Sequence, residues 1–574
     1  MRMRHSTRRV MRRTVIAVGL LLAPTCFAAG TAFAADSLDE HRGSTLRRTP
    51  LPQEKPVEHD TPPLIAQTGG SPTLRRVDPA TTEPTRAPAY HPEKQVPPSM
   101  SPEATATTYE RDKFSGDPVY PAGPYDTKSQ IDIYGGKSRV NGPRPPLELG
   151  HPMYQEGPLP DSINLFGEKN LARPQLLVYG DWRTAVAWND NGNTETGLVA
   201  TRLNVDVDLK LTSTERIHMF VRPFDKGNKG QFTRYEFFGD DRKRGDLQVD
   251  GNIETLFFEG DLGALAAGLT GEYNAYDIPI AFGLMPLLFQ NGLWLEDAFL
   301  GGALTIPARN SRLLDISNID LTFFAGSDKV TTQAIRETAR NIQDDNSASI
   351  FGVAAFADLQ EGYLEAGYGY THDRRGSAFD FDYHNATLAF TRRYGGWLSN
   401  SVRGVWNFGQ KPALGHRQTA DGYLLVMENS LITSKPLTLV PYANFFVGRD
   451  RPQSLARDFG AGGILKTVGI NFETDGLTGF PKLDDTANDT YGGAVGIQYL
   501  FNLDQQVVVE VASAQVIGGN NKPGRTAKGD QYAIGARYQI PLSMATIFRA
   551  DVIQAWRSED ADTAGIRFEI RVKF

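Results

Sequence analysis

The sequence predicts an all-β protein, a transmembrane antiparallel up-and-down β-barrel of about 18 strands preceded by a disordered Pro-rich arm. Three features support this fold class: an N-terminal export signal, alternating segments after residue 175, and a final segment that alternates as far as an aromatic residue. The most apolar long run after the signal, residues 263–289, contains Glu272, Asp277 and Pro279 and does not read as a spanning helix. A chain without such a helix crosses a membrane only as a closed barrel.

Residues 1–34 have the features of a secretory signal peptide. Six arginines lie within the first 13 residues, an apolar run follows from Val15 to Ala23, and Ala32-Phe33-Ala34 supplies the cleavage pattern. We expect the general secretory pathway, because Arg12 stands where a twin-arginine signal needs an apolar residue. Cleavage removes those six arginines and no carboxylate, so the formal net charge falls from -7 to -13. It also removes the only cysteine, which excludes disulfides and thiol chemistry.

Residues 35–165 are predicted to be a disordered periplasmic arm. Of the 35 prolines, 22 lie between residues 36 and 160, and such a composition does not support a packed core. Residues 135–138, Gly-Gly-Lys-Ser, resemble the end of a phosphate-binding loop, but Ile131 replaces a required glycine and prolines follow instead of a helix. We therefore exclude a nucleotide site and expect, at most, a periplasmic partner for the arm.

Residues 166–574 are predicted to form the barrel, because apolar and polar residues alternate along segment after segment. Roughly eighteen strands are expected. They lie near residues 175–189, 196–212, 216–224, 251–262, 277–289, 299–307, 316–326, 348–359, 362–372, 378–393, 397–408, 421–432, 437–449, 491–502, 505–517, 529–540, 543–557 and 563–574.

The connections between these segments alternate between short turns and long loops, as in outer-membrane barrels. Two connections break the rhythm. Asn191-Gly192 predicts a tight hairpin on the long-loop side, and residues 263–276 form a long connection on the short-turn side, which leaves a miscounted strand open. The even strand number favours a barrel over a soluble sandwich.

The last segment, Ile566 to Phe574, places its apolar residues on one face and Arg567, Glu569, Arg571 and Lys573 on the other. It resembles the closing strand of bacterial outer-membrane β-barrels, whose final aromatic residue is read by the barrel-assembly machinery. The resemblance implies location in the Gram-negative outer membrane, contact with outer-membrane lipid, and Phe574 as the membrane-assembly signal.

Residues 281–294 followed by residues 297–304 form an apolar strand, a Gly-containing turn and a return strand rich in glycine. This hairpin is similar to the corresponding hairpin of porin-like exporters of the alginate-export family. The resemblance implies a large monomeric porin-like barrel. It transfers no functional residue and does not identify alginate as the substrate.

The polar faces of the strands would line the lumen. A basic wall is predicted from the last strands and the first, comprising Arg183, Arg537, Arg549, Arg557, Arg567, Arg571 and Lys573. Predicted acidic pore-lining residues are Asp206, Asp208, Glu365, Glu428, Glu510 and Asp551. Opposed charges would create a transverse field, and arginine offers fixed donors to carboxylate or phosphate. The alternative is that these charges pair and brace a wide, water-filled lumen.

The long connection from residue 450 to residue 490 mixes glycines with apolar residues such as Ile464, Leu465 and Val468. That mixture is unusual for a loop in water, and a loop that folds inward and narrows the pore is one of three interpretations that stay open. An external binding surface and a plain surface loop are the alternatives.

The leading functional hypothesis is an outer-membrane channel for hydrophilic solutes, anionic or saccharide-like. The alternative is a non-transporting barrel that binds partners through its arm and outer loops. An enzyme is not expected, because no Gly-x-Ser-x-Gly elbow or recognisable Ser/His/acid set occurs. We expect no cofactor, no nucleic-acid partner and no metal site, since His218, His372, His384 and His416 lack ligand spacing.

Overall fold

The structure is a computed structural model. It describes residues 143–574 except 151–160, 227–230, 240–244, 312, 314–315, 336–346, 360, 437, 474–475, 502–504, 520–524 and 526. The predicted signal peptide and nearly all of the predicted arm lie outside the described residues.

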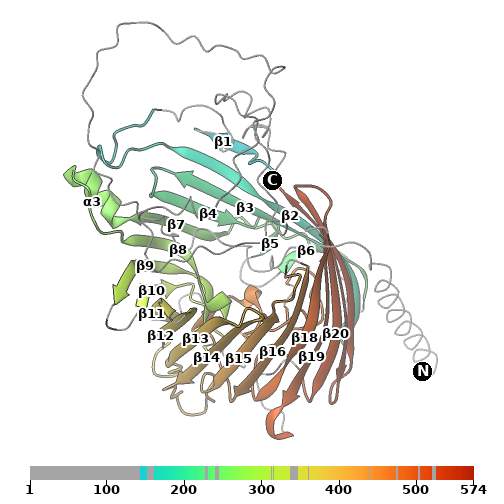
Figure 1. Ribbon diagram of the computed structural model, residues 1–574. Coiled ribbons are helices and arrows are strands. Elements are labelled where there is room, and N and C mark those ends of the chain that lie inside the picture. Colours follow the sequence, from blue (N-terminus) through green and yellow to red (C-terminus); the bar gives the residue numbers. More distant parts are fainter. Residues whose placement is uncertain are drawn as a thin grey trace, which may run out of the picture. The chain divides into compact units, whose positions relative to one another are not determined.

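Eighteen antiparallel strands close into a barrel, as predicted (Figure 1). Each strand pairs with the next along the chain, and the last strand returns to the first with the register Asp181↔Lys573 through Asp190↔Ala564. The barrel strands are β2 (Gln175–Asp190), β3 (Glu195–Lys210), β4 (Arg216–Val221), β7 (Ile253–Asp261), β8 (Pro279–Phe289), β9 (Leu295–Ser311), β10 (Ile316–Asp328), β11 (Ala348–Leu359), β12 (Gly362–Asp373), β13 (Tyr383–Tyr394), β14 (Leu398–Phe408), β15 (Tyr423–Leu431), β16 (Leu439–Arg449), β18 (Thr490–Phe501), β19 (Gln505–Val516), β20 (Gln531–Pro541), β21 (Thr546–Arg557) and β22 (Thr563–Lys573).

Several shorter elements accompany the barrel. Strand β3 divides its length between two partners, with β4 beside Val205 to Lys210 and β6 beside Gly197 to Thr201. Strand β1 pairs with the start of β2, beyond the point where β22 ends. The short elements are β1 (Leu147–Leu149), β5 (Asp225–Lys226), β6 (Gln231–Phe238), β17 (Ala456–Arg457), α3 (Leu262–Thr270), η6 (Gln290–Gly292), η7 (Phe459–Ala461) and η8 (Ile517–Gly519).

The connection between β7 and β8 contains a helix where the sequence left open a miscounted strand. Helix α3 begins after Asp261, whose carboxylate accepts the Ala264 N–H at 2.8 Å, and it ends at Gly271, which adopts a φ of 73°. A side-chain N-cap and a left-handed glycine are ordinary helix boundaries. Among the described residues, no helix is long and apolar enough to cross a membrane.

The strands alternate between an outward apolar face and an inward polar face. Along β22, Phe568 and Ile570 are 43% and 46% exposed, whereas the intervening Glu569 is 4% exposed. The same contrast holds on β19, where Val511 is exposed and Glu510 is buried. This arrangement leaves apolar side chains, including many aromatic ones, on the outer surface of the barrel.

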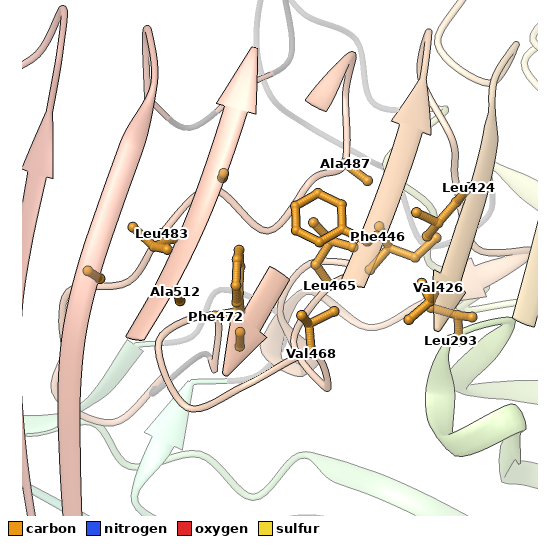
Figure 2. Packing of buried hydrophobic residues seen from close by; sticks show 14 of the residues in the cluster. Leu293, Leu424, Val426, Phe446, Leu465, Val468, Phe472, Leu483, Ala487 and Ala512 are labelled. Atoms are coloured by element: carbon orange, nitrogen blue, oxygen red, sulfur yellow. The ribbon is translucent and has the colours of Figure 1, made fainter. Parts of the chain in front are cut away.

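The connection between β16 and β18, residues 450–489, folds into the barrel, as one of the three interpretations of this loop expects. We call it the inner loop. Its Leu465, Val468 and Phe472 are fully buried and pack with Val426 and Phe446, which lie on the inward faces of β15 and β16 (Figure 2). Their neighbours Leu425, Met427 and Phe445 point outward and are exposed. The inner loop therefore has its own hydrophobic core against the barrel wall.

The turn between β8 and β9 also reaches inward. Its residues Gln290, Asn291 and Gly292 all have positive φ, of 54°, 53° and 80°. This turn buries Trp294, whose indole N–H donates to Asn385 Oδ1 on β13 at 3.0 Å. The turn of the hairpin that resembles alginate exporters thus occupies part of the barrel interior.

Replacing Val511 by Lys should destabilise the barrel in lipid, because Val511 lies in mid-strand on the outward face. Urea titration in lipid vesicles should show a loss of about 2–4 kcal/mol in unfolding free energy. The matched control is Gln515→Lys near the end of the same strand, for which we expect about 0–1 kcal/mol. Equal losses at both positions would contradict an outward face immersed in hydrocarbon.

Candidate functional site

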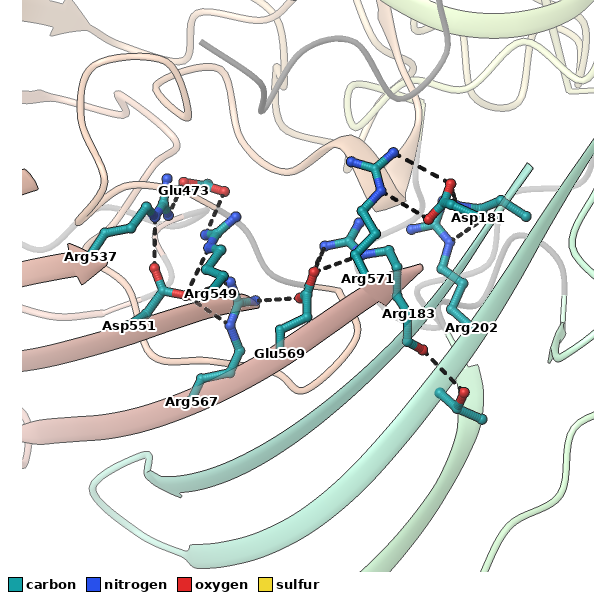
Figure 3. Close-up of polar contacts among 12 residues, drawn as sticks. Asp181, Arg183, Arg202, Glu473, Arg537, Arg549, Asp551, Arg567, Glu569 and Arg571 are labelled. Carbon is teal, nitrogen blue, oxygen red and sulfur yellow. Dashed lines mark hydrogen bonds and ion pairs between the residues drawn. The ribbon is translucent and has the colours of Figure 1, made fainter. Parts of the chain in front are cut away.

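Charged side chains from four adjacent strands, β20, β21, β22 and β2, meet on the inward face where the barrel closes (Figure 3). Asp551 is their centre. It accepts hydrogen bonds from Arg537 Nε at 2.7 Å, Arg549 Nε at 2.8 Å and Arg567 Nη2 at 2.7 Å. We call the whole set the charge ladder, made of Asp181, Arg183, Arg537, Arg549, Asp551, Arg567, Glu569 and Arg571.

The ladder continues across the closure from β22 to β2. Arg183 Nε and Nη2 donate to the two oxygens of Glu569 at 3.0 and 3.1 Å, a bidentate contact between β2 and β22. Arg571 Nε donates to Asp181 Oδ2 at 3.1 Å, and Asn204 on β3 donates to the other oxygen at 3.1 Å. Two ion pairs thus join the first and last strands in addition to their backbone hydrogen bonds.

The strand register explains this pairing. It places Asp551 between Arg537 on β20 and Arg567 on β22, so opposite charges are direct cross-strand neighbours. Arg183 has like-charged register partners on both sides, Arg571 on β22 and Arg202 on β3. Arg183 and Arg571 each bind a carboxylate two residues away along the neighbouring strand, Glu569 for Arg183 and Asp181 for Arg571.

Five arginines of the predicted basic wall are paired with carboxylates, and their role as the basic wall of a pore stays a prediction. Mutual pairing, the alternative considered above, describes five of the seven predicted cations. Arg557 lies apart from the ladder and donates to the carbonyls of Ala561 and Asn191, in two loops. Lys573 is the register partner of Asp181 at the end of β22.

The predicted acidic residues do not gather at one place. Only Asp551 belongs to the ladder. Asp208 on β3 lies 3.8 Å from both Arg216 and His218 on β4. Glu428 on β15 binds Arg403 on β14 at 2.8 Å. Asp206 lies on β3, Glu365 on β12 and Glu510 on β19.

Glu510 anchors the inner loop. Its side chain is 1% exposed and accepts the backbone N–H groups of Ile470 and Asn471, each at 2.9 Å. It also accepts the Tyr442 hydroxyl at 2.6 Å. Glu510 therefore lies beneath the loop, and its role in this structure is to satisfy loop backbone donors that burial would otherwise leave unpaired.

Glu473, in the inner loop, is a ladder partner that the sequence did not reveal. Its carboxylate binds Arg537 Nη2 and, at 3.1 Å, Arg549 Nη2. Nearby in the same loop, the Phe480 ring lies 5.6 Å from the guanidinium carbon of Arg567. No pattern marked Glu473, because a loop has no period and its path depends on distant packing.

The inner loop also binds the β8–β9 turn. Strand β17 pairs in parallel with the start of β9, and Ser454 Oγ donates to the Leu293 carbonyl at 2.8 Å. Arg457 Nη1 binds Glu296 at 3.0 Å, and Lys466 binds the other oxygen of that carboxylate. Glu296, Arg457 and Lys466 were not among the predicted residues. Two inward segments thus support each other inside the barrel.

The electrostatics of Glu473 follow from its surroundings. Burial by itself would raise its pKa, but Arg537 and Arg549 outweigh burial and lower the pKa to about 2. Glu473 is therefore ionised at neutral pH and acts as a counter-ion to the ladder.

The described residues contain no group of three or more His, Asp or Glu side chains placed to hold a metal ion. Each carboxylate of the charge ladder accepts hydrogen bonds from at least one arginine. The ladder presents charged donors and acceptors on an inward wall.

Comparison with known proteins gives similarity to solved structures only. No family model and no curated protein matches the sequence. The chain is similar to Pseudomonas aeruginosa OpdQ, with 10% identity, a TM-score of 0.45, and coverage of 70% of this chain and 97% of OpdQ. It is also similar to P. aeruginosa OpdL, with 13% identity, a TM-score of 0.43, and coverage of 70% and 98%.

A third similar structure is the outer membrane protein opdK of P. aeruginosa, with 10% identity, a TM-score of 0.43, and coverage of 69% of this chain and 98% of opdK. Because these identities and TM-scores are low, the barrel fold rests on the strand pairing itself. The resemblance of the β8–β9 hairpin to alginate exporters stays a prediction.

Replacing Glu510 by Ala should undock the inner loop, because the Ile470 and Asn471 N–H groups and the Tyr442 hydroxyl lose their acceptor. Each buried group left unpaired costs about 1–3 kcal/mol. Protease cleavage within residues 450–489 of the folded protein should become at least several-fold faster.

The control for this measurement is Glu361→Ala, which removes an 84% exposed carboxylate from its pair with Arg392. That variant should be cleaved at the wild-type rate. Resistance of the Glu510→Ala loop equal to that of wild type would contradict the anchoring role.

The contact of Glu473 with the ladder should depend on pH. Because its folded-state pKa lies near 2, below the ordinary 4.5, ionised Glu473 stabilises the docked loop above pH 4.5. This contribution is lost as the pH falls from 4.5 toward 2. A fluorophore on Thr467→Cys should report an unchanged loop environment from pH 7 to 4.5 and a change below that.

The same label in a Glu473→Gln background separates Glu473 from Asp551, the other carboxylate beside these arginines. The difference between the two backgrounds should be constant above pH 4.5 and shrink as the pH falls toward 2, where about half of the Glu473 carboxylates are protonated. A difference that does not depend on pH would contradict the assignment to Glu473.

Proposed function

We propose that this protein is a porin-like outer-membrane channel for small hydrophilic solutes that are anionic or saccharide-like. The observation that carries the proposal is a closed barrel with an apolar outer face and a charge ladder on its inward face. The inner loop lies against that ladder, which suits a constriction.

Location in the outer membrane is supported by the outward side chains. Trp182, Phe351, Tyr532 and Trp556 are each at least 45% exposed and lie on different strands of the barrel. Such a surface needs lipid around it. We infer export by the general secretory pathway and assembly by the barrel-assembly machinery, with Phe574 as the signal. In the folded barrel, Phe574 exchanges two 3.0 Å backbone hydrogen bonds with Gly180.

The preference for anions rests on the balance of the ladder. Within the set formed by the charge ladder and Glu473, five guanidinium groups face four carboxylates, an excess of one positive charge. Asp206 and Asp208 lie on the neighbouring strand β3 and supply opposite charge beside it.

A non-transporting barrel that binds partners through its arm and outer loops is the second candidate. The observation that favours it is the hydrophobic core of the inner loop, which fixes the loop against a large part of the inward wall. In that case the charge ladder stabilises a barrel whose interior the inner loop occupies, and the periplasmic arm binds the partner.

Planar-bilayer recording of the purified mature protein separates these candidates. We expect stepwise conductance with a reversal potential that favours anions in a salt gradient. The control is a variant without residues 35–165, which should conduct equally well if the arm does not gate the pore.

Absence of conductance from both proteins would refute the channel. Unchanged solute uptake combined with loss of a co-purifying partner in the arm deletion would support attachment instead.

A further inference from the structure

The carboxylate of Glu473 differs from the other carboxylates of the charge ladder in its origin. Asp181, Asp551 and Glu569 project from barrel strands whose register fixes their positions. Glu473 comes from the inner loop, 64 residues from Arg537 and 76 from Arg549 in sequence. Within the ladder as the structure describes it, Glu473 is the one acidic partner that is not part of the wall.

The two arginines that hold Glu473 present a ready site for an anion. Arg537 and Arg549 are 12% and 13% exposed, and each uses its Nε to bind Asp551. Their Nη2 groups then converge on the two oxygens of Glu473. Guanidinium donors fixed in this way by a second carboxylate are preorganised for an oxyanion.

The ladder loses much of its balance without Glu473. Five guanidinium groups would then face three carboxylates, so the excess positive charge rises from one to two. A small cavity lies beside Glu473, lined by Asn471, Phe480, Arg537, Arg549 and Arg567. This cavity has room for about one water molecule, so a larger anion needs the space that the Glu473 carboxylate occupies.

We propose that Arg537 and Arg549 form an internal anion-binding site and that Glu473 occupies it as a built-in competitor, which makes Glu473 a determinant of selectivity. The inference rests on the proposed channel function and deepens it. A permeating oxyanion binds by replacing the Glu473 side chain, and the loop core around Val468 and Phe472 stays in place. The wild-type protein therefore binds anions weakly enough to release them.

The competition follows from mass action within the chain. A tethered carboxylate has a high effective concentration at its site, so a free anion must overcome it before it binds. Removing the tethered charge while keeping the side-chain shape should therefore raise the affinity for a free anion. Glu473→Gln is such a change, because glutamine keeps the length and one carbonyl oxygen of glutamate.

Calorimetric titration with succinate is the first experiment, on the full mature protein in detergent. We expect Glu473→Gln to bind succinate at least about tenfold more tightly than wild type. The double variant Glu473→Gln, Arg549→Gln should lose that gain. A difference in gel mobility between heated and unheated samples checks that each variant is folded. A folded Glu473→Gln protein that binds succinate with wild-type affinity would overturn the proposal.

The second experiment measures reversal potentials in a potassium chloride gradient. Glu473→Gln should shift the reversal potential toward that of chloride. The matched control is Glu428→Gln, which removes an equal charge from a carboxylate that binds Arg403 on another part of the wall. An equal shift in both variants would show a general effect of lumen charge and overturn the site.

The two readouts separate failure of the inference from failure of the channel. Succinate binding that follows the predicted order without any conductance would uphold the anion site and refute transport. Conductance with identical succinate affinity in all variants would uphold the channel and refute the anion site.

Discussion

The rest of the structure depends on the pairing of β22 with β2. In a closed barrel every strand has two neighbours, so no strand leaves an edge of unpaired backbone groups. Closure also joins residues from opposite ends of the barrel sequence, and it creates the contacts of Arg183 with Glu569 and of Arg571 with Asp181. The charge ladder is thus assembled in part by the same pairing that removes the edges of the barrel.

Buried charges make this wall stable only if they are nearly matched. A guanidinium group without a partner on a partly dry wall pays a large desolvation penalty, whereas a bidentate carboxylate offsets much of it. The ladder meets this requirement with three carboxylates from the strands and a fourth, Glu473, from the inner loop. Docking of the inner loop therefore also brings a fourth carboxylate to the wall.

The inner loop is held by three kinds of interaction that work together. Apolar burial around Leu465 and Phe472 supplies the non-directional part. Glu510 accepts hydrogen bonds from the backbone of the loop, and Glu473 forms ion pairs with arginines of the charge ladder. The β8–β9 turn adds support from another part of the wall through Arg457 and Glu296. A segment held at so many points is part of the barrel's interior architecture.

The sequence by itself determined the class of fold, the eighteen strands and which face of each strand is charged, because a period of two is a local property of an extended chain. Apolar residues such as Val468 also made an inward loop one of three interpretations. Only the tertiary structure decided that Arg537, Arg549 and Arg567 share Asp551, and that Glu473 joins them. Register and loop path depend on contacts between distant residues, which no local pattern records.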